Sequence, residues 1–78
     1  MENEILQLIK EDLYILQMEI ALKVNGVNFY IEPIRDFLEV YSTERNKREV
    51  YNNLEDVIEK FIINNKPLKE QLDLLQYQ

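Results

Sequence analysis

The sequence predicts an α+β domain with an N-terminal helix, an antiparallel meander of three or four strands, and two C-terminal helices packed on the sheet. Two patterns indicate this fold class. Apolar and polar residues alternate on both sides of Asn25-Gly26, and apolar residues from Leu54 to Ile62 recur at the spacing of three and four that marks one helix face. The chain has 78 residues, which fits a single small domain over residues 1–78.

A short apolar stripe predicts the first helix from Asn3 to about Glu11. The period of the pattern changes near Asp12, where we expect the first strand to begin. One long helix over residues 3–24 is the alternative, and the alternation that starts at Leu16 argues against it.

The dipeptide Asn25-Gly26 predicts a two-residue turn, because Asn and Gly accept the positive φ angles of the tightest antiparallel connection. The hydrophobic alternation independently predicts the same register as this turn. That register pairs Val24 with Val27, Leu22 with Phe29, and Ile20 with Ile31. Two signals that agree on one register predict a β-hairpin.

The second strand is expected to close near Glu32, because Pro33 cannot donate a hydrogen bond in a central strand. A third strand is expected over Phe37–Ser42, where the alternation resumes. Residues 43–47 are polar and predict a loop, and Arg48–Tyr51 is expected to form a short, charged fourth strand at an edge.

Two helices are expected after the sheet. Asn52-Asn53 is an N-cap signal for the first of them, and Asn64-Asn65 is expected to end it, because asparagine tolerates the left-handed conformation of a C-cap. Pro67 suits the first position of the final helix. The predicted core consists of Leu22, Val24, Phe29, Ile31, Leu38, Val40, Val57, Ile58 and Phe61.

Composition excludes several kinds of chemistry. The chain has no Cys and no His, so it lacks thiolate nucleophiles, the commonest general base and the commonest transition-metal ligands. Its single glycine is already used in the turn, which excludes glycine-rich phosphate loops. We expect no catalytic residues, no cofactor and no metal, and therefore no enzyme.

The charge balance bears on partners. Nine basic and fifteen acidic residues give a net charge of −6, which disfavours nucleic acid and anionic membranes and favours a basic protein partner. Acidity that only keeps the protein in solution is the alternative. The acidic N-terminal residues and the lack of a long apolar run predict neither a signal peptide nor a membrane span, so a cytoplasmic location is expected.

Acidic residues concentrate in two places. The predicted hairpin register sets Glu19 opposite Glu32, on the face that also carries Glu39 of the third strand. A second group lies on the polar side of the helix that follows the sheet, and it consists of Glu55, Asp56 and Glu59. Neither group predicts catalysis, because like charges in water form no concave, water-poor site.

Aromatic residues gather on the sheet face opposite the predicted core. Tyr30, Phe37 and Tyr41 belong to this face. Exposed rings of this kind are typical of an interface, and a terminal helix that covers them is the alternative. The basic residues of segment 45–48 are flanked by acids, so a role in solubility fits them better than nucleic-acid binding.

The hairpin from Met18 to Ile31 and the acidic helix from Leu54 to Ile62 give a layout that resembles small acidic phage anti-CRISPR inhibitors. Nuclease immunity proteins share the same acidic character. The resemblance implies a protein inhibitor that presents carboxylates to a basic nucleic-acid-binding channel. It rests on no specific motif, so it transfers no functional residue.

We therefore expect a small acidic protein-binding module that inhibits a basic partner, such as a nucleic-acid-processing enzyme, by occupying its nucleic-acid-binding surface. The alternative is a homodimer or larger homo-oligomer that uses the aromatic face. The candidate partner-binding residues are Glu19, Glu32, Glu39, Glu55, Asp56, Glu59, Tyr30, Phe37 and Tyr41.

Overall fold

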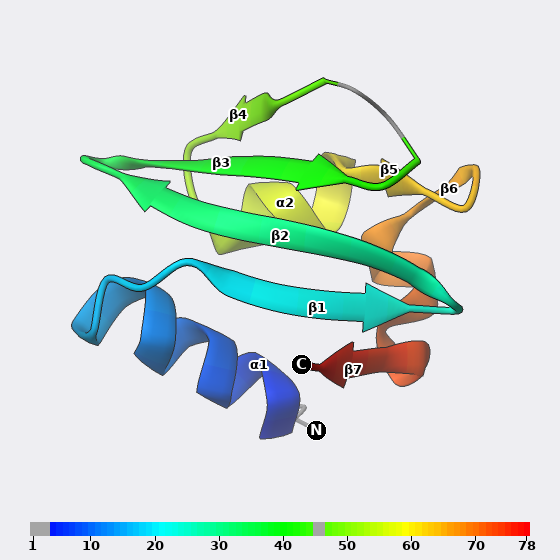
Figure 1. The fold of residues 1–78 in the computed structure, drawn as a ribbon, viewed down its shortest axis with the longest axis horizontal. Coiled ribbons are helices and arrows are strands. Elements are labelled where there is room, and N and C mark those ends of the chain that lie inside the picture. Colours follow the sequence, from blue (N-terminus) through cyan, green and yellow to red (C-terminus); the bar gives the residue numbers. More distant parts are fainter. Residues whose placement is uncertain (1–3, 45–46) are drawn as a thin grey trace.

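Strands that follow one another in the sequence form most of a twisted antiparallel sheet (Figure 1). The computed structural model describes residues 4–44 and 47–78. Within these residues the sheet has five strands in the order β4-β3-β2-β1-β7. Their bounds are β1 Ile20–Val24, β2 Val27–Ile34, β3 Phe37–Ser42, β4 Glu49–Tyr51 and β7 Leu75–Tyr77. The α+β class and the meander are confirmed, and the sheet has five strands where three or four were predicted.

The first hairpin has the predicted register. Ile20 pairs with Ile31, Leu22 with Phe29, and Val24 with Val27. Both turn residues have positive φ, 46° at Asn25 and 85° at Gly26. The turn and the hydrophobic alternation therefore place the same side chains on one face of the sheet.

The prediction that the first strand begins near Asp12 is wrong. Helix α1 (Glu4–Lys10) continues into a π-helical segment, η1 (Glu11–Ile15), and β1 begins only at Ile20. The helical stripe extends farther than predicted because Leu13 is buried in the same core as Ile9, four residues before it. The alternation at Leu16 and Met18 therefore marks an exposed connection rather than a strand.

The prediction that the second strand closes near Glu32 is also wrong, because β2 continues through Pro33 to Ile34. Pro33 pairs with Leu38 of β3. On its other side β1 starts opposite Ile31, so β2 extends past the end of β1. Proline is tolerated at this position because its missing amide opposes no strand there. The third strand matches its prediction, and the fourth begins one residue later than predicted, at Glu49.

Helix α2 (Leu54–Lys60) begins at the predicted cap, where the Asn53 side chain accepts a hydrogen bond of 2.9 Å from the backbone amide of Asp56. The predicted helix end at Asn64-Asn65 is wrong. Strands β5 (Ile62–Ile63) and β6 (Lys66–Pro67) form a small hairpin after the helix. Asn64 and Asn65 do adopt positive φ, 58° and 64°, but as the turn of this hairpin.

The predicted final helix is a 3₁₀ segment, η2 (Leu68–Leu74), and the chain then enters β7. Leu75, the first residue of β7, pairs with Val24 of β1. The Tyr77 hydroxyl donates a hydrogen bond to the Asp12 carboxylate. Burial, together with this hydrogen bond, raises the pKa of Tyr77 to about 12. Strand β7 is thus attached both to the sheet and to η1.

A single core lies between one face of the sheet and the helical segments. In Figure 1, α2 lies behind β2 and β3, and α1 runs below β1. Every predicted core residue is buried except Ile58, which is partly buried against the core. The core gains Ile9 and Leu13 from the N-terminal segments and Leu68 and Leu75 from the C-terminal ones. These contributions complete the covered face of the sheet.

Candidate functional site

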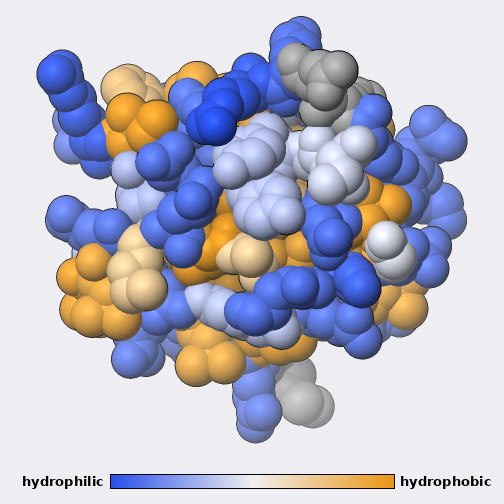
Figure 2. Space-filling view, viewed as in Figure 1, coloured by the Kyte–Doolittle hydropathy of each residue, from blue (hydrophilic) through white to orange (hydrophobic). Residues whose placement is uncertain are grey.

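The face of the sheet opposite the core is uncovered in the described part of the chain, and we call it the open face. None of its strand side chains is buried. Figure 2 shows that pale blue side chains gather over β2 and β3 there, with hydrophilic side chains around them. The open face carries Ala21, Lys23, Asn28, Tyr30, Glu32, Glu39, Tyr41 and Val50. Of the two alternatives for the aromatic face, the described residues favour an uncovered face, on which Tyr30 and Tyr41 are half-buried and Phe37 is exposed.

Two tyrosines form the centre of the open face. Tyr30 and Tyr41 are paired across β2 and β3, and their rings stack with centroids 5.0 Å apart and an interplanar angle of 26°. Direct cross-strand pairing brings such rings within contact distance, so the stack follows from the register. Phe37 does not join it, because it lies at the far end of β3, where its side chain is 46% exposed.

Three predicted carboxylates lie around this stack. Glu32 is paired directly with Glu39 across β2 and β3. Glu19 precedes β1, so the predicted pairing with Glu32 does not form within the strand ladder. Its carboxylate instead accepts a hydrogen bond of 2.9 Å from the Tyr41 hydroxyl. This hydrogen bond is the main reason that the pKa of Tyr41 is raised above its ordinary value.

Arg48 is a central residue of the open face that the sequence analysis missed. Its guanidinium carbon lies 4.2 Å from the centroid of the Tyr41 ring. The guanidinium also forms ion pairs with Glu39 and, at 3.5 Å, with Glu32. Arg48 was interpreted as part of a solubility cluster because its contacts arise only when β4 aligns beside β3. The flanking sequence carries no signal for them.

The acidic residues of α2 belong to a different surface. Helix α2 lies behind the sheet in the view of Figure 1, so Glu55, Asp56 and Glu59 cannot meet the same flat partner surface as Tyr41. Glu59 pairs with Lys69 at 3.0 Å. Glu55 and Asp56 occupy the first helical turn, where acidic side chains interact favourably with the helix dipole. The structure thus separates the predicted partner-binding residues of the open face from the three on α2.

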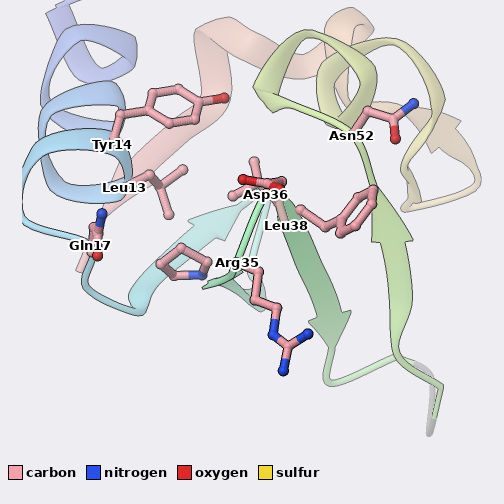
Figure 3. A pocket seen from close by; sticks show the side chains of 9 residues that line it. Leu13, Tyr14, Gln17, Arg35, Asp36, Leu38 and Asn52 are labelled. Carbon is pink, nitrogen blue, oxygen red and sulfur yellow. The ribbon is translucent and has the colours of Figure 1, made fainter.

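A pocket of about 480 Å³ lies at one end of the sheet, between η1, the β2–β3 turn and the segment before α2 (Figure 3). Its wall includes Tyr14, whose hydroxyl accepts a hydrogen bond of 2.9 Å from the backbone amide of Leu54. Asp36 lies near the middle of the view, and Arg35 extends away from the hollow. Phe37 lines this pocket rather than the tyrosine stack. An acid–base site or an anion site would require charged groups that converge on one point. Arg35 and Asp36 do not converge in this way.

Two further observations concern residues 4–44 and 47–78. They contain no group of three or more Asp, Glu, His or Cys side chains that could hold a metal ion. None of their helices is long and apolar enough to cross a membrane.

Comparison of the chain with protein-family models, curated proteins and solved structures gives no match. The chemistry of the open face is therefore the basis for inferring a function. Stacked tyrosine rings with adjacent carboxylates attract cations through both the ring faces and the negative charges. Such a surface is suited to recognising basic side chains.

Proposed function

We propose that this protein is a small binding module whose open face engages a basic protein partner. The observation that carries this proposal is the half-exposed Tyr30–Tyr41 stack with Glu19, Glu32 and Glu39 around it. Soluble proteins seldom expose a contiguous aromatic surface without a use, and tyrosine is enriched in interfaces. A net charge of −6 adds long-range attraction toward a basic partner.

The partner is a nucleic-acid-processing protein, and binding inhibits it. Carboxylates and phosphates form the same charge-assisted hydrogen bonds with Arg and Lys, so a carboxylate surface competes with nucleic acid for such side chains. The layout of helix, hairpin sheet and acidic helix, which resembles anti-CRISPR inhibitors and nuclease immunity proteins, supports the same function.

Capture from host extract followed by a competition assay tests this proposal. The open-face variant is Glu19→Gln with Glu32→Gln and Glu39→Gln. Its matched control, Glu55→Gln with Asp56→Asn and Glu59→Gln, removes three carboxylates from α2 instead. We expect the wild type and the control to retain a basic partner and to displace nucleic acid from it. The open-face variant should lose both properties, and the binding should weaken as salt is raised.

Two results would contradict the proposal. Equal capture by all three proteins at every salt concentration would show that the open-face carboxylates are not part of the interface. A captured partner that still binds its nucleic acid in the presence of this protein would exclude inhibition by occupation.

A homodimer is the second candidate, and one observation favours it. Val50 on the edge strand β4 is 62% exposed and lies on the open face, where a second sheet could pair or stack. Sedimentation of the wild type and of Tyr41→Ser separates the two candidates. A dimer that Tyr41→Ser dissociates would support self-association, whereas a monomer at high micromolar concentration in both proteins would exclude it.

A further inference from the structure

Arg48 occupies a defined place on the open face, which we call the guanidinium site. The site consists of the Tyr41 ring and the carboxylates of Glu32 and Glu39. The guanidinium group lies over the ring at 4.2 Å and contacts both carboxylates. One planar cation therefore satisfies an aromatic face and two anions at once.

The site needs a cation for a physical reason. Glu32 and Glu39 lie directly opposite each other on β2 and β3, and like charges in that position repel. A guanidinium between them removes this repulsion, and its flat shape also matches the ring face. The neighbouring contacts hold the ring in place, since Tyr41 stacks on Tyr30 and donates a hydrogen bond to Glu19.

Arg48 itself is replaceable. It lies in the segment before β4 and belongs to no strand, so its side chain can leave the site without breaking a strand pair. The side chain is 53% exposed, and exposed ion pairs contribute little to folding stability. An arginine from another protein could therefore take the place of Arg48 in the site.

We propose that the guanidinium site recognises an arginine side chain of the basic partner, and that Arg48 is an internal competitor which the partner's arginine displaces. This inference rests on the proposed function, because it names the group through which the open face engages its partner. Charge complementarity indicates a cation, and the chain's own guanidinium over the Tyr41 ring indicates arginine rather than lysine. Both carboxylate contacts of Arg48 come from one guanidinium nitrogen, Nη1, while the flat face of the same group lies over the Tyr41 ring. An ammonium group can contact carboxylates but lacks the flat face that stacks on the ring.

Arg48→Gln tests the inference, with Lys47→Gln as a matched control that removes the same charge one residue away from the site. The probes are short oligoarginine and oligolysine peptides of equal length, and fluorescence anisotropy gives their affinities. If Arg48 fills the site for about nine-tenths of the time, emptying it raises the apparent affinity for oligoarginine roughly tenfold. Lys47→Gln should change this affinity by less than about twofold, since only a screened surface charge is lost.

A second variant examines the aromatic part of the site. Adding Tyr41→Leu to Arg48→Gln should abolish most of the preference for oligoarginine over oligolysine. Circular dichroism of each variant verifies the fold. In the wild type, the NMR signal of the Arg48 side-chain NεH group should move toward the position of a free arginine as oligoarginine is added.

The outcomes separate the two proposals. Equal gains in affinity from Arg48→Gln and Lys47→Gln, or equal gains for both peptides, would overturn the guanidinium site and leave the proposed function standing. An Arg48 signal that does not move while the peptide binds would do the same. The proposed function would be contradicted by a different result, in the capture assay. There, substitution of Glu19, Glu32 and Glu39 would leave partner binding unchanged.

Discussion

The two faces of the sheet are built from alternate residues of the same strands. Phe29 and Ile31 are fully buried on the covered face, whereas Tyr30, between them, is only partly buried on the open face. Moving along β2 by one residue thus exchanges a core position for a surface position. Folding stability and the proposed recognition therefore involve adjacent residues of one strand and can be tested separately.

The largest expected effect comes from the covered face. Phe29→Ala removes a fully buried ring that packs 5.6 Å from the ring of Phe61, and should reduce the free energy of unfolding by about 3–5 kcal/mol. Urea unfolding measures the loss. If this variant does not fold, Ile31→Val should still fold with a loss of about 0.5–1.5 kcal/mol. A loss below 0.5 kcal/mol in both variants, roughly the range of surface sites, would contradict the assignment of the faces.

A smaller effect is expected at the turn that sets which residues face the core. Gly26 has a φ of 85°, and a Cβ added there meets no atom within 4 Å. Gly26→Val should therefore cost only backbone strain, about 1–2 kcal/mol. Gly26→Asn is the control, because asparagine accepts positive φ more readily. Equal stability of the two variants in urea unfolding would show that the turn does not require this conformation.

A third test uses pH to probe the attachment of β7 on the covered face. The pKa of Tyr77 is about 12 in the folded protein, above the ordinary value of 10. Its contribution to stability is therefore complete below pH 10 and is lost as pH rises toward 12. Stability should fall over this window in the wild type, and it should fall less in Tyr77→Phe. Urea unfolding at a series of alkaline pH values measures both proteins, and parallel curves would remove Tyr77 as the cause.

The smallest effect on stability is expected on the open face. Tyr30→Ser removes a ring that contacts Tyr41 but lies outside the core, and should change the free energy of unfolding by less than about 1 kcal/mol. The same substitution should weaken binding to the partner captured in the assay above. If Tyr30→Ser reduced the free energy of unfolding as much as Phe29→Ala does, the two faces would not differ in their contribution to stability.

The sequence predicts the local features of this fold well. The first hairpin, the third strand, the Asn53 cap and most of the core were all predictable, because each depends on turn chemistry or periodicity within a short segment. The left-handed conformation of Asn64 and Asn65 was predictable too. Its use in a hairpin was not predictable, because this hairpin is held by contacts outside its own short segment. The Asn64 side-chain amide donates a hydrogen bond to the backbone carbonyl of Val24, and the buried Gln71 side chain donates one to the carbonyl of Ile63.

Features that depend on distant segments escaped prediction. Strand β7 forms only because β1 offers a free edge, and nothing in residues 75–77 indicates that edge. The candidate site divides in the same way. Alternation placed Tyr30 and Tyr41 on one face, but the contacts of Arg48 depend on how β4 aligns with β3.

The position of β7 beside β1 has a consequence for the order of events during synthesis. Strands β1 to β4 can pair as soon as each leaves the ribosome, because each neighbours the strand made just before it. The outer edge of β1 must wait for the last strand of the sheet. Until then it presents unpaired backbone groups that another chain can bind. Completion of the sheet by β7 therefore ends the period in which the outer edge of β1 can pair with a strand from another copy of the protein.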